Sequence, residues 1–135
     1  MKYFIALFAF GLGFGLSKMD AVAQSSKLPS VSAKQLAKKI DQGLEMTILD
    51  VRTHGELIEG TISNAKHLDF KSDDFEQRLS SLDKSKTYFV YSNNGNRSAR
   101  TVEMMRALGF SNVYNVKGGM AAWRDKGKPL KRLEQ

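Results

Sequence analysis

The residue types that could carry chemistry gather in one short stretch, YSNNGNRSAR, which spans residues 91–100. It lies between an apolar run typical of a strand and a pattern typical of a helix, so we expect a strand-to-helix loop. Backbone N–H groups at a helix start have no intrahelical acceptor and carry a partial positive charge, which favours a bound anion. Gly95 permits unusual backbone angles, and Arg97 would add a planar set of donors. The predicted anion-binding residues are Asn93, Asn94, Gly95, Asn96, Arg97 and Ser98.

Ser92 is the residue of this loop placed to react, but a serine hydroxyl is a weak nucleophile that needs an adjacent base. The chain has only two histidines, His54 and His67, and neither is near Ser92 in the sequence. Either histidine could reach the loop in the folded chain, so a serine-dependent hydrolase is one alternative. We otherwise interpret His67 as a surface residue or as one that supports the site from behind.

Three charged residues, Asp50, Arg52 and Glu56, follow another short apolar run. They could act as acid or base, but a buried carboxylate needs partners whatever its function. We therefore interpret them as supporting residues, whose ion pairs or hydrogen bonds fix their own loop.

The elements that must position these residues alternate along the chain. Strands are expected at residues 46–51, 65–68, 87–91 and 112–116, where apolar, β-branched and aromatic residues gather. Such strands alternating with amphipathic helices indicate βαβ units. The predicted fold is therefore α/β, with a central, mostly parallel sheet flanked by helices on both faces. Sites in such sheets form at the carboxyl ends of the strands, where residues 92–97 fall.

The helices show start and stop signals. Ser32 and Gln35 form a capping box at the first helix, and Ser72 is expected to cap the second. The third is predicted over residues 98–108, with Leu108 among its inward residues, and a short last helix contains Trp123.

The amino-acid composition excludes several classes of function. The chain has 135 residues, a formal net charge of +7 and no cysteine. The absence of cysteine excludes disulfides, thiolate metal sites and cysteine nucleophiles, and two histidines are too few for a structural zinc site. We predict no metal and no cofactor. No Lys/Arg block is dense enough to suggest nucleic-acid binding.

The N-terminus has the pattern of a secretory signal peptide. A charged start precedes an apolar and glycine run over residues 4–16, and a small-residue signal, AVA, ends at Ala23. The run is shorter than the ~20 residues of a membrane span. We therefore expect residues 1–23 to be a signal peptide and the protein to be exported, periplasmic or secreted, meeting the membrane only during export. The alternative is an uncleaved anchor.

Four stretches in order carry a resemblance to a known family: LDVRTHGELIEGTISNAKHLDF, VYSNNGNRSA, MMRALGFSNVYNVKGG and GGMAAW. The chain resembles rhodanese-like domains over residues 31–127, which leaves a polar leader at 24–30 and a basic, solvated tail at 128–135. The resemblance implies a three-layer α/β domain in which a cysteine at the first loop position carries a persulfide sulfur from a donor to an acceptor. Five residues follow that position, a length that the family uses for sulfur rather than for phosphate or arsenate.

The departures from the family pattern change the functional expectation. Ser92 stands at the position of the family's cysteine, and an oxygen cannot form the persulfide of the family mechanism. Thr61 replaces the usual histidine, Asn64 a glycine and His67 an asparagine. We therefore expect an exported domain that binds a small anion, such as thiosulfate or sulfate, or a persulfide-bearing protein, without persulfide catalysis. A sulfurtransferase whose native residue is not Ser92 is the other alternative.

Overall fold

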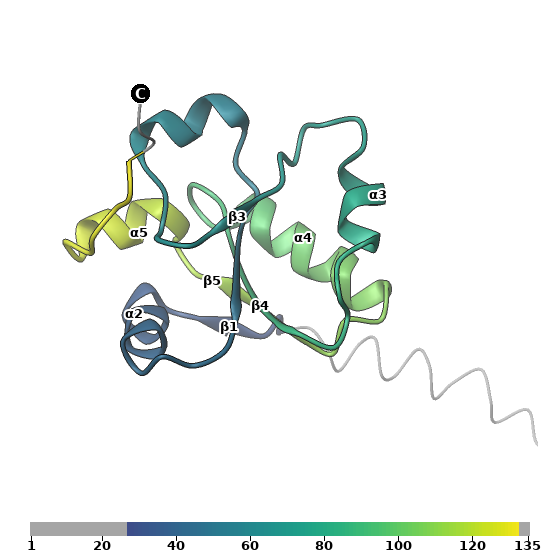
Figure 1. Cartoon of the computed structure of the whole chain (residues 1–135), viewed down its shortest axis with the longest axis horizontal. Helices are drawn as coiled ribbons and strands as arrows, with labels where there is room; N and C mark the ends of the chain where they lie inside the picture. Colours follow the sequence, from purple (N-terminus) through teal and green to yellow (C-terminus); the bar gives the residue numbers. More distant parts are fainter. Residues whose placement is uncertain (1–26, 133–135) are drawn as a thin grey trace, which may run out of the picture.

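The computed structural model describes residues 27–132, shown in Figure 1. The signal peptide expected at 1–23, the first residues of the polar leader and the last three residues of the basic tail therefore lie outside the described residues. None of the helices within 27–132 is long and apolar enough to cross a membrane.

A five-stranded sheet forms the centre of the domain, and all of its strand pairs are parallel. The spatial order is β1-β5-β4-β2-β3. The strands are β1 (Ser30–Val31), β2 (Thr47–Asp50), β3 (Lys66–His67), β4 (Thr87–Tyr91) and β5 (Asn112–Val116). The four strands expected from the sequence are confirmed, whereas β1 begins inside the segment that we expected to be a polar leader.

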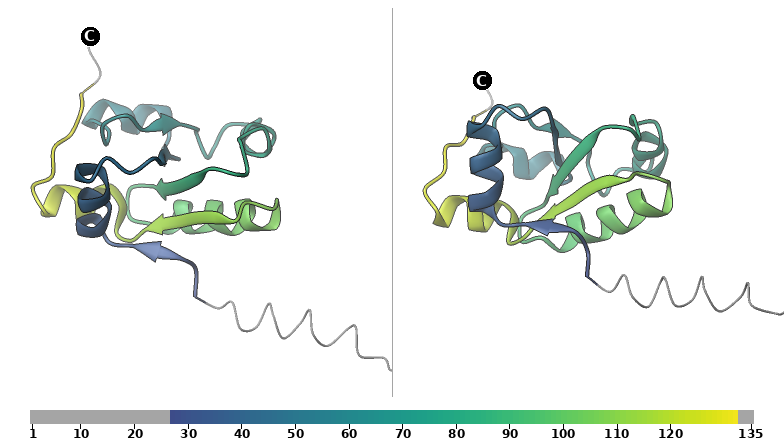
Figure 2. Two further views of the ribbon diagram at one scale, coloured as in Figure 1. Left: turned by 60° about the horizontal axis from the view of Figure 1, so that its bottom comes forward. Right: turned by 90° about the horizontal axis from the view of Figure 1, so that it is seen from below.

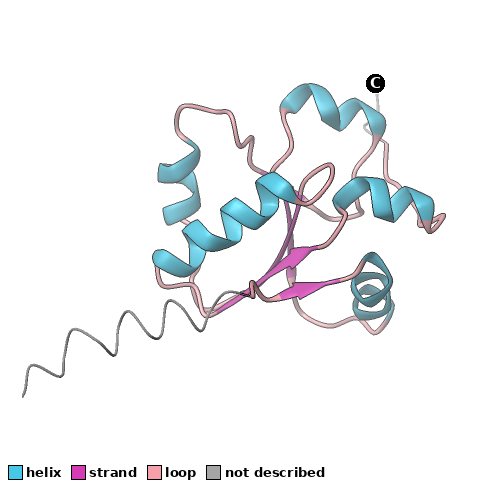
Figure 3. Cartoon of the chain, turned by 180° about the vertical axis from the view of Figure 1, so that it is seen from behind, coloured by secondary structure: helices cyan, strands magenta, loops and turns pink. Residues whose placement is uncertain are grey.

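Helices cover both faces of the sheet, which confirms the three-layer α/β architecture (Figures 2 and 3). They are α2 (Ala33–Asp41), the 3₁₀ helix η1 (His54–Glu59), α3 (Phe75–Ser80), α4 (Asn96–Ala107) and α5 (Gly119–Asp125). On one face, residues of α2 and α5 pack with Phe89 and Tyr91 of β4. On the other, residues of α3 and α4 pack with Tyr88 and Val90. Successive side chains of a strand point to opposite faces, so β4 contributes to both clusters.

Two helix starts show how well local signals predict structure. The capping box at α2 is confirmed: Ser32 Oγ accepts from Gln35 N, and Gln35 Oε1 accepts from Ser32 N. The cap expected at Ser72 is wrong. The N-cap of α3 is Asp74, and Ser72 Oγ donates to the Asp74 carboxylate instead. The chain makes a turn at this point, in which Phe75 N donates to Ser72 O, before the helix begins.

Helix α4 also differs from expectation at both ends. It begins at Asn96, two residues before the predicted start, with Gly95 as its N-cap. Leu108, expected to point inward, is 36% exposed. Phe110 is buried in its place, because the chain turns after Ala107 and Phe110 N donates back to Met105 O.

Residues 129–131 of the basic tail are not part of a free, solvated end as we expected. Thr61 and Lys131 form an antiparallel bridge with two backbone hydrogen bonds of 2.8 Å. The Trp123 indole N–H donates to Pro129 O at 2.9 Å, and Leu130 packs against the α2–α5 side of the core. Residues 129–131 therefore belong to the folded domain, although the Lys131 side chain is exposed.

Candidate functional site

Three connections meet at the carboxyl edge of the sheet and form the candidate site. The loop after β4 carries Ser92, η1 follows β2, and the turn at Gly118 and Gly119 follows β5. Gly95 has a left-handed backbone (φ +95°), which turns the chain from β4 into α4. Loop residues 92–98 therefore lie at the N-terminus of a 12-residue helix, where helix geometry favours negative charge.

The Ser92 hydroxyl is buried beneath its own loop. Ser92 Oγ accepts hydrogen bonds from the amides of Gly95 and Ser98, each at 3.2 Å. It also lies 3.1 Å from Ser98 Oγ, which in turn donates to Asn115 Oδ1 at 2.6 Å. Because the Ser98 proton goes to Asn115, Ser92 is the donor in the bond between the two hydroxyls. Both lone pairs and the proton of Ser92 are thus already used inside the protein.

No base among the residues that the structure describes is in contact with Ser92. Within residues 27–132 its hydroxyl bonds only to the amides of Gly95 and Ser98 and to the Ser98 hydroxyl. The hydrogen-bond chain ends on the Asn115 side-chain amide, which does not take up a proton near neutral pH. His67 contacts the carbonyl of Arg52 instead. The geometry therefore gives no support to the hydrolase alternative, which requires a base within hydrogen-bond reach.

The remaining loop residues present a polar outer surface. The side chains of Asn93, Asn94 and Asn96 are exposed, and Asn94 Oδ1 accepts from Asn96 N at 3.2 Å. The amides of Asn94 and Arg97 have no acceptor among the described residues. Ser92 thus occupies the predicted anion-binding amides of Gly95 and Ser98. The amides of Asn94 and Arg97 stay free of acceptors from residues 27–132.

Arg97 does not extend over the loop as the sequence suggested. Its guanidinium makes two 2.8 Å hydrogen bonds with the two carboxylate oxygens of Glu56 in η1. Arg97, by donating these bonds, lowers the pKa of Glu56 to about 2, and donation from the backbone and hydroxyl of Thr53 lowers that pKa as well. The pair ties η1 to the start of α4 and so fixes one wall of the site.

Asp50 and Arg52 form the ion pair expected of supporting residues. Both are buried, and Arg52 donates to the Asp50 carboxylate through Nε and Nη2 and to the carbonyl of Gly60. Tyr91 also donates to Asp50, at 2.6 Å, and its oxygen accepts from Ile62 N. Burial, followed by the Asp50 charge, raises the pKa of the Tyr91 hydroxyl well above its usual range. This group fixes the ends of β2 and β4 and leaves no free acid or base.

Two parts of the site were missed by the sequence reasoning. Asn115 accepts the hydrogen bond of the Ser98 hydroxyl. The sequence could have indicated this role, because Asn115 is a polar residue inside the apolar strand NVYNV. The second missed part is the start of α5, where Met120 N and Ala121 N donate to the carbonyls of Ser92 and Asn93. The paired glycines of GGMAAW indicate a close backbone approach at this point, but nothing in the sequence shows which segment they approach.

The fold and the loop define an α/β domain with a strand–loop–helix cradle at the carboxyl edge of a parallel sheet. Residues 32–126 match the family of the rhodanese-like domain. The chain is 34% identical over 103 residues to the putative sulfurtransferase YtwF of Bacillus subtilis, covering 76% of this chain and 97% of that protein. It is 26% identical over 110 residues to the probable adenylyltransferase/sulfurtransferase MoeZ of Mycobacterium tuberculosis, covering 82% of this chain and 28% of that protein.

Solved structures agree with the sequence matches. The crystal structure of a rhodanese-like domain protein from Staphylococcus aureus superposes with a TM-score of 0.67 at 36% identity, covering 77% of this chain and 99% of that one. The solution structure of the rhodanese-like domain of Anabaena Alr3790 gives a TM-score of 0.69 at 32% identity, covering 79% and 81%. This chain belongs to the rhodanese-like domain family, and it has no cysteine.

Proposed function

We propose that this chain is an exported rhodanese-like domain that binds a small sulfur-containing anion, or a persulfide-bearing partner, at the loop of residues 92–98 without persulfide catalysis. The observation that carries the proposal is the Ser92 hydroxyl. It stands at the first loop position, where the family resemblance places the cysteine, and its hydrogen-bonding capacity is already filled by Gly95 and Ser98.

The absence of catalysis follows from the chemistry of the atom at position 92. A persulfide enzyme forms a sulfur–sulfur bond between its thiolate and the transferred sulfur, and it needs a thiol whose pKa is near neutral. A serine hydroxyl is far less acidic and holds no sulfur for that bond. With no described residue placed as a base beside it and no thiol anywhere in the chain, Ser92 can neither be activated nor carry sulfur.

Binding without catalysis is supported by the parts of the loop that remain. The amides of Asn94 and Arg97 have no acceptor among residues 27–132, and they lie at the positive end of the α4 dipole. The loop itself contains no carboxylate, and the whole chain has a net charge of +7. A small anion makes few contacts, so we expect dissociation constants in the micromolar to millimolar range.

A sulfur-carrying partner is supported by the relatives. YtwF and MoeZ are both named as sulfurtransferases, and in MoeZ the match covers only part of a longer protein. A domain of this family that kept its loop but lost its thiol would retain the surface that meets such a partner.

The test combines turnover with binding. The chain without residues 1–23 is incubated with thiosulfate and cyanide, alongside a Ser92→Ala variant, and thiocyanate is measured. We expect equal, background rates for both; turnover that exceeds the variant's rate contradicts the proposal.

Binding is then followed by amide chemical shifts during titration with thiosulfate, sulfate and phosphate, with chloride at equal ionic strength as the control. We expect the largest shifts at residues 93–98. Shifts that are no larger there than on the far side of the domain would show that the loop does not hold the anion.

A further inference from the structure

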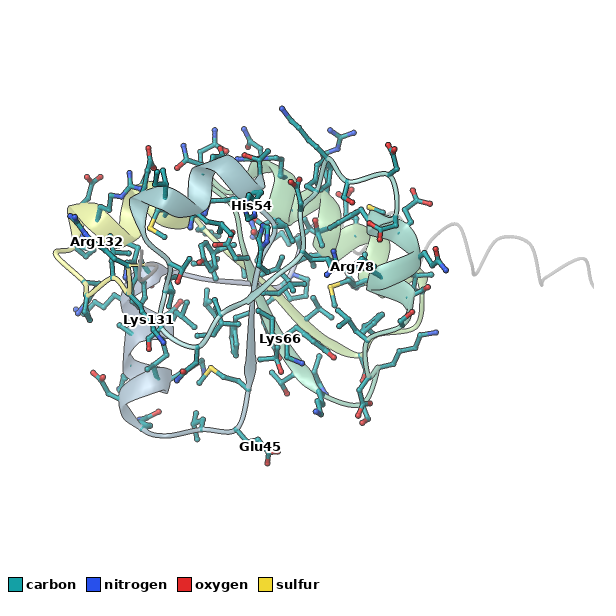
Figure 4. All side chains as sticks on the ribbon, turned by 45° about the horizontal axis from the view of Figure 1, so that its top comes forward. Glu45, His54, Lys66, Arg78, Lys131 and Arg132 are labelled. Atoms are coloured by element: carbon teal, nitrogen blue, oxygen red, sulfur yellow. The ribbon has the colours of Figure 1, made fainter. Side chains whose placement is uncertain are left out.

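The two histidines of the chain lie close together, outside the hydrogen-bond group of Ser92. His54 begins η1 and His67 ends β3, so the two come from different connections at the carboxyl edge of the sheet. Their ring centroids are 6.2 Å apart and the rings are tilted by 47°. Figure 4 shows His54 near the middle of the face that this edge presents to the viewer.

The proton on the His67 ring has a fixed place. His67 Nε2 lies 2.7 Å from the carbonyl oxygen of Arg52. A carbonyl oxygen only accepts, so Nε2 carries the proton, and in the neutral ring Nδ1 keeps a lone pair. Metal-binding histidines have this arrangement: one nitrogen donates to a backbone carbonyl while the other holds the metal.

The backbone of His54 is tied to the segment that follows His67. His54 N donates to Asp69 Oδ2 at 3.0 Å, and Asp69 Oδ1 accepts from Lys71 N. The His54 side chain is exposed, and its ring nitrogens have no hydrogen-bond partner among residues 27–132. Both nitrogens of this ring are therefore open to a ligand.

We propose that His54 and His67 bind one divalent transition-metal ion of the class that prefers imidazole, Cu²⁺, Ni²⁺ or Zn²⁺. Such ions lie about 2.0–2.1 Å from an imidazole nitrogen, so the centroids of two rings on one ion lie about 4.5 Å apart at a right angle and about 6.4 Å apart when the rings are on opposite sides of the ion. The observed separation of 6.2 Å is near the upper end of this range, which suits two imidazoles on opposite sides of a tetragonal Cu²⁺ or Ni²⁺ ion. Cu²⁺ should bind most tightly, because divalent affinities at nitrogen sites rise to copper.

The two rings are the only side chains that the site needs. Within the described residues no group of three or more His, Asp or Glu side chains is placed to hold a metal. The other coordination positions are therefore left to water or to an added anion, and the site is weaker than a three-ligand centre.

The charged groups near His54 and His67 do not oppose the binding of a cation. The Arg52 guanidinium is neutralised by Asp50. Lys66 precedes His67 in β3, and its side chain points to the opposite face of the sheet. Asp69 places a carboxylate beside the backbone of His54.

The chain suits a direct test because it has two histidines and no cysteine. The full chain and its variants are titrated with Cu²⁺, and binding is followed by electron paramagnetic resonance, which counts the coordinated nitrogens. We expect two imidazole nitrogens in the unmodified protein. His54→Ala and His67→Gln should each leave one nitrogen and weaken binding by about tenfold or more.

His67→Gln keeps a side-chain donor for the Arg52 carbonyl, because its amide nitrogen reaches as far as His67 Nε2, so it separates loss of the ligand from loss of the fold. Lys66→Ala is the matched control beside it and should bind copper as the unmodified chain does. A spectrum with one nitrogen in the unmodified chain, or single-histidine variants that bind equally well, would overturn the proposal. Neither outcome bears on thiosulfate turnover or on the loop shifts, so this site and the proposed function are tested separately.

Discussion

Gly119 lies against the backbone of Ser92 so closely that there is no room for a side chain between them. A Cβ atom on Gly119 would collide with the Ser92 carbonyl oxygen and would lie 2.9 Å from the carbonyl carbon and oxygen of Asn93. This approach lets Met120 N and Ala121 N donate to those two carbonyls, at 2.9 and 3.0 Å. The start of α5 thus holds the first two residues of the candidate loop.

Gly119→Ala should therefore destabilise the domain strongly. The new methyl group meets backbone, which cannot move aside without breaking the bonds from α5, and φ of +53° adds strain. We expect the free energy of unfolding to fall by about 3 kcal/mol or more. Gly127→Ala is the matched control, with φ of +63° and nothing within 4 Å, and should cost only about 1–2 kcal/mol. Urea denaturation compares the two; equal losses would mean that the close contact contributes nothing beyond backbone strain.

Ser92→Ala should destabilise the protein although it removes a single oxygen. The change leaves the buried amides of Gly95 and Ser98 without their acceptor, and an unsatisfied buried donor costs about 1–3 kcal/mol. Ser111→Ala on the surface is the control and should lie within about 0.5 kcal/mol of the unmodified chain. A Ser92→Ala variant as stable as the control would show that the hydroxyl does not hold the loop closed.

Ser92→Cys should create sulfurtransferase activity in this chain. The thiolate would take the outer sulfur of thiosulfate and release sulfite, and cyanide would then remove that sulfur as thiocyanate. The two amides that now reach Ser92 would stabilise the thiolate and lower the pKa of the thiol. We expect thiocyanate production at least about tenfold above the unmodified chain. Ser111→Cys supplies an exposed thiol outside the loop and should stay at background. Background turnover in both variants would show that the site has lost more than its thiol.

Sequence periodicity and local signals were enough to predict the sheet. Strands β4 and β5 have the predicted bounds because each is a short apolar, β-branched and aromatic run between clear breakers. The capping box at Ser32 and Gln35 was readable because all of its atoms lie within four residues. The errors lie where tertiary contacts decide. Nothing local to Ser72 shows that the chain turns once more before α3, and nothing local to Leu108 shows that Phe110 fills the core instead.

The same distinction applies to the candidate site. The loop was predictable because strand, glycine and helix follow one another along the chain. The partners of its side chains were not, because they come from distant segments. The sequence predicts that Arg97 contacts a bound anion. In the structure both terminal nitrogens of its guanidinium donate to Glu56, which lies 41 residues earlier. Asn115 reaches Ser98 from 17 residues further on. Periodicity carries no information about such pairs.

Glu56→Gln should cost stability at neutral pH and little in acid. The pKa of Glu56 is lowered to about 2 in the folded chain, from about 4.3 in an unfolded one, so its stabilisation is present above pH 4 to 5 and is lost as the pH falls toward 2. We expect a loss of about 1 kcal/mol at pH 7, since solvent screens a partly exposed pair. Glu59→Gln removes the more exposed pair with Arg124 and should change little. Denaturation curves at pH 7 and pH 2.5 test this; a difference between Glu56→Gln and the unmodified chain that persists in acid contradicts it.

Removing residues 129–135 should destabilise the domain and alter the environment of Trp123. The deletion takes away both backbone bonds to Thr61 and the Pro129 carbonyl that accepts the indole N–H, and it uncovers the core under Leu130. Three lost hydrogen bonds and one half-buried leucine give an expected loss of about 2–4 kcal/mol in the free energy of unfolding. Trp123 is the only tryptophan of the chain, so the tryptophan fluorescence reports on the surroundings of this ring alone. The emission should shift to the red as water reaches the ring. A chain shortened only by residues 133–135 keeps all of these contacts and serves as the control. If both shortened chains unfold at the same urea concentration and have the same emission, residues 129–131 do not stabilise the fold. The basic tail would then be the free end that its sequence suggested.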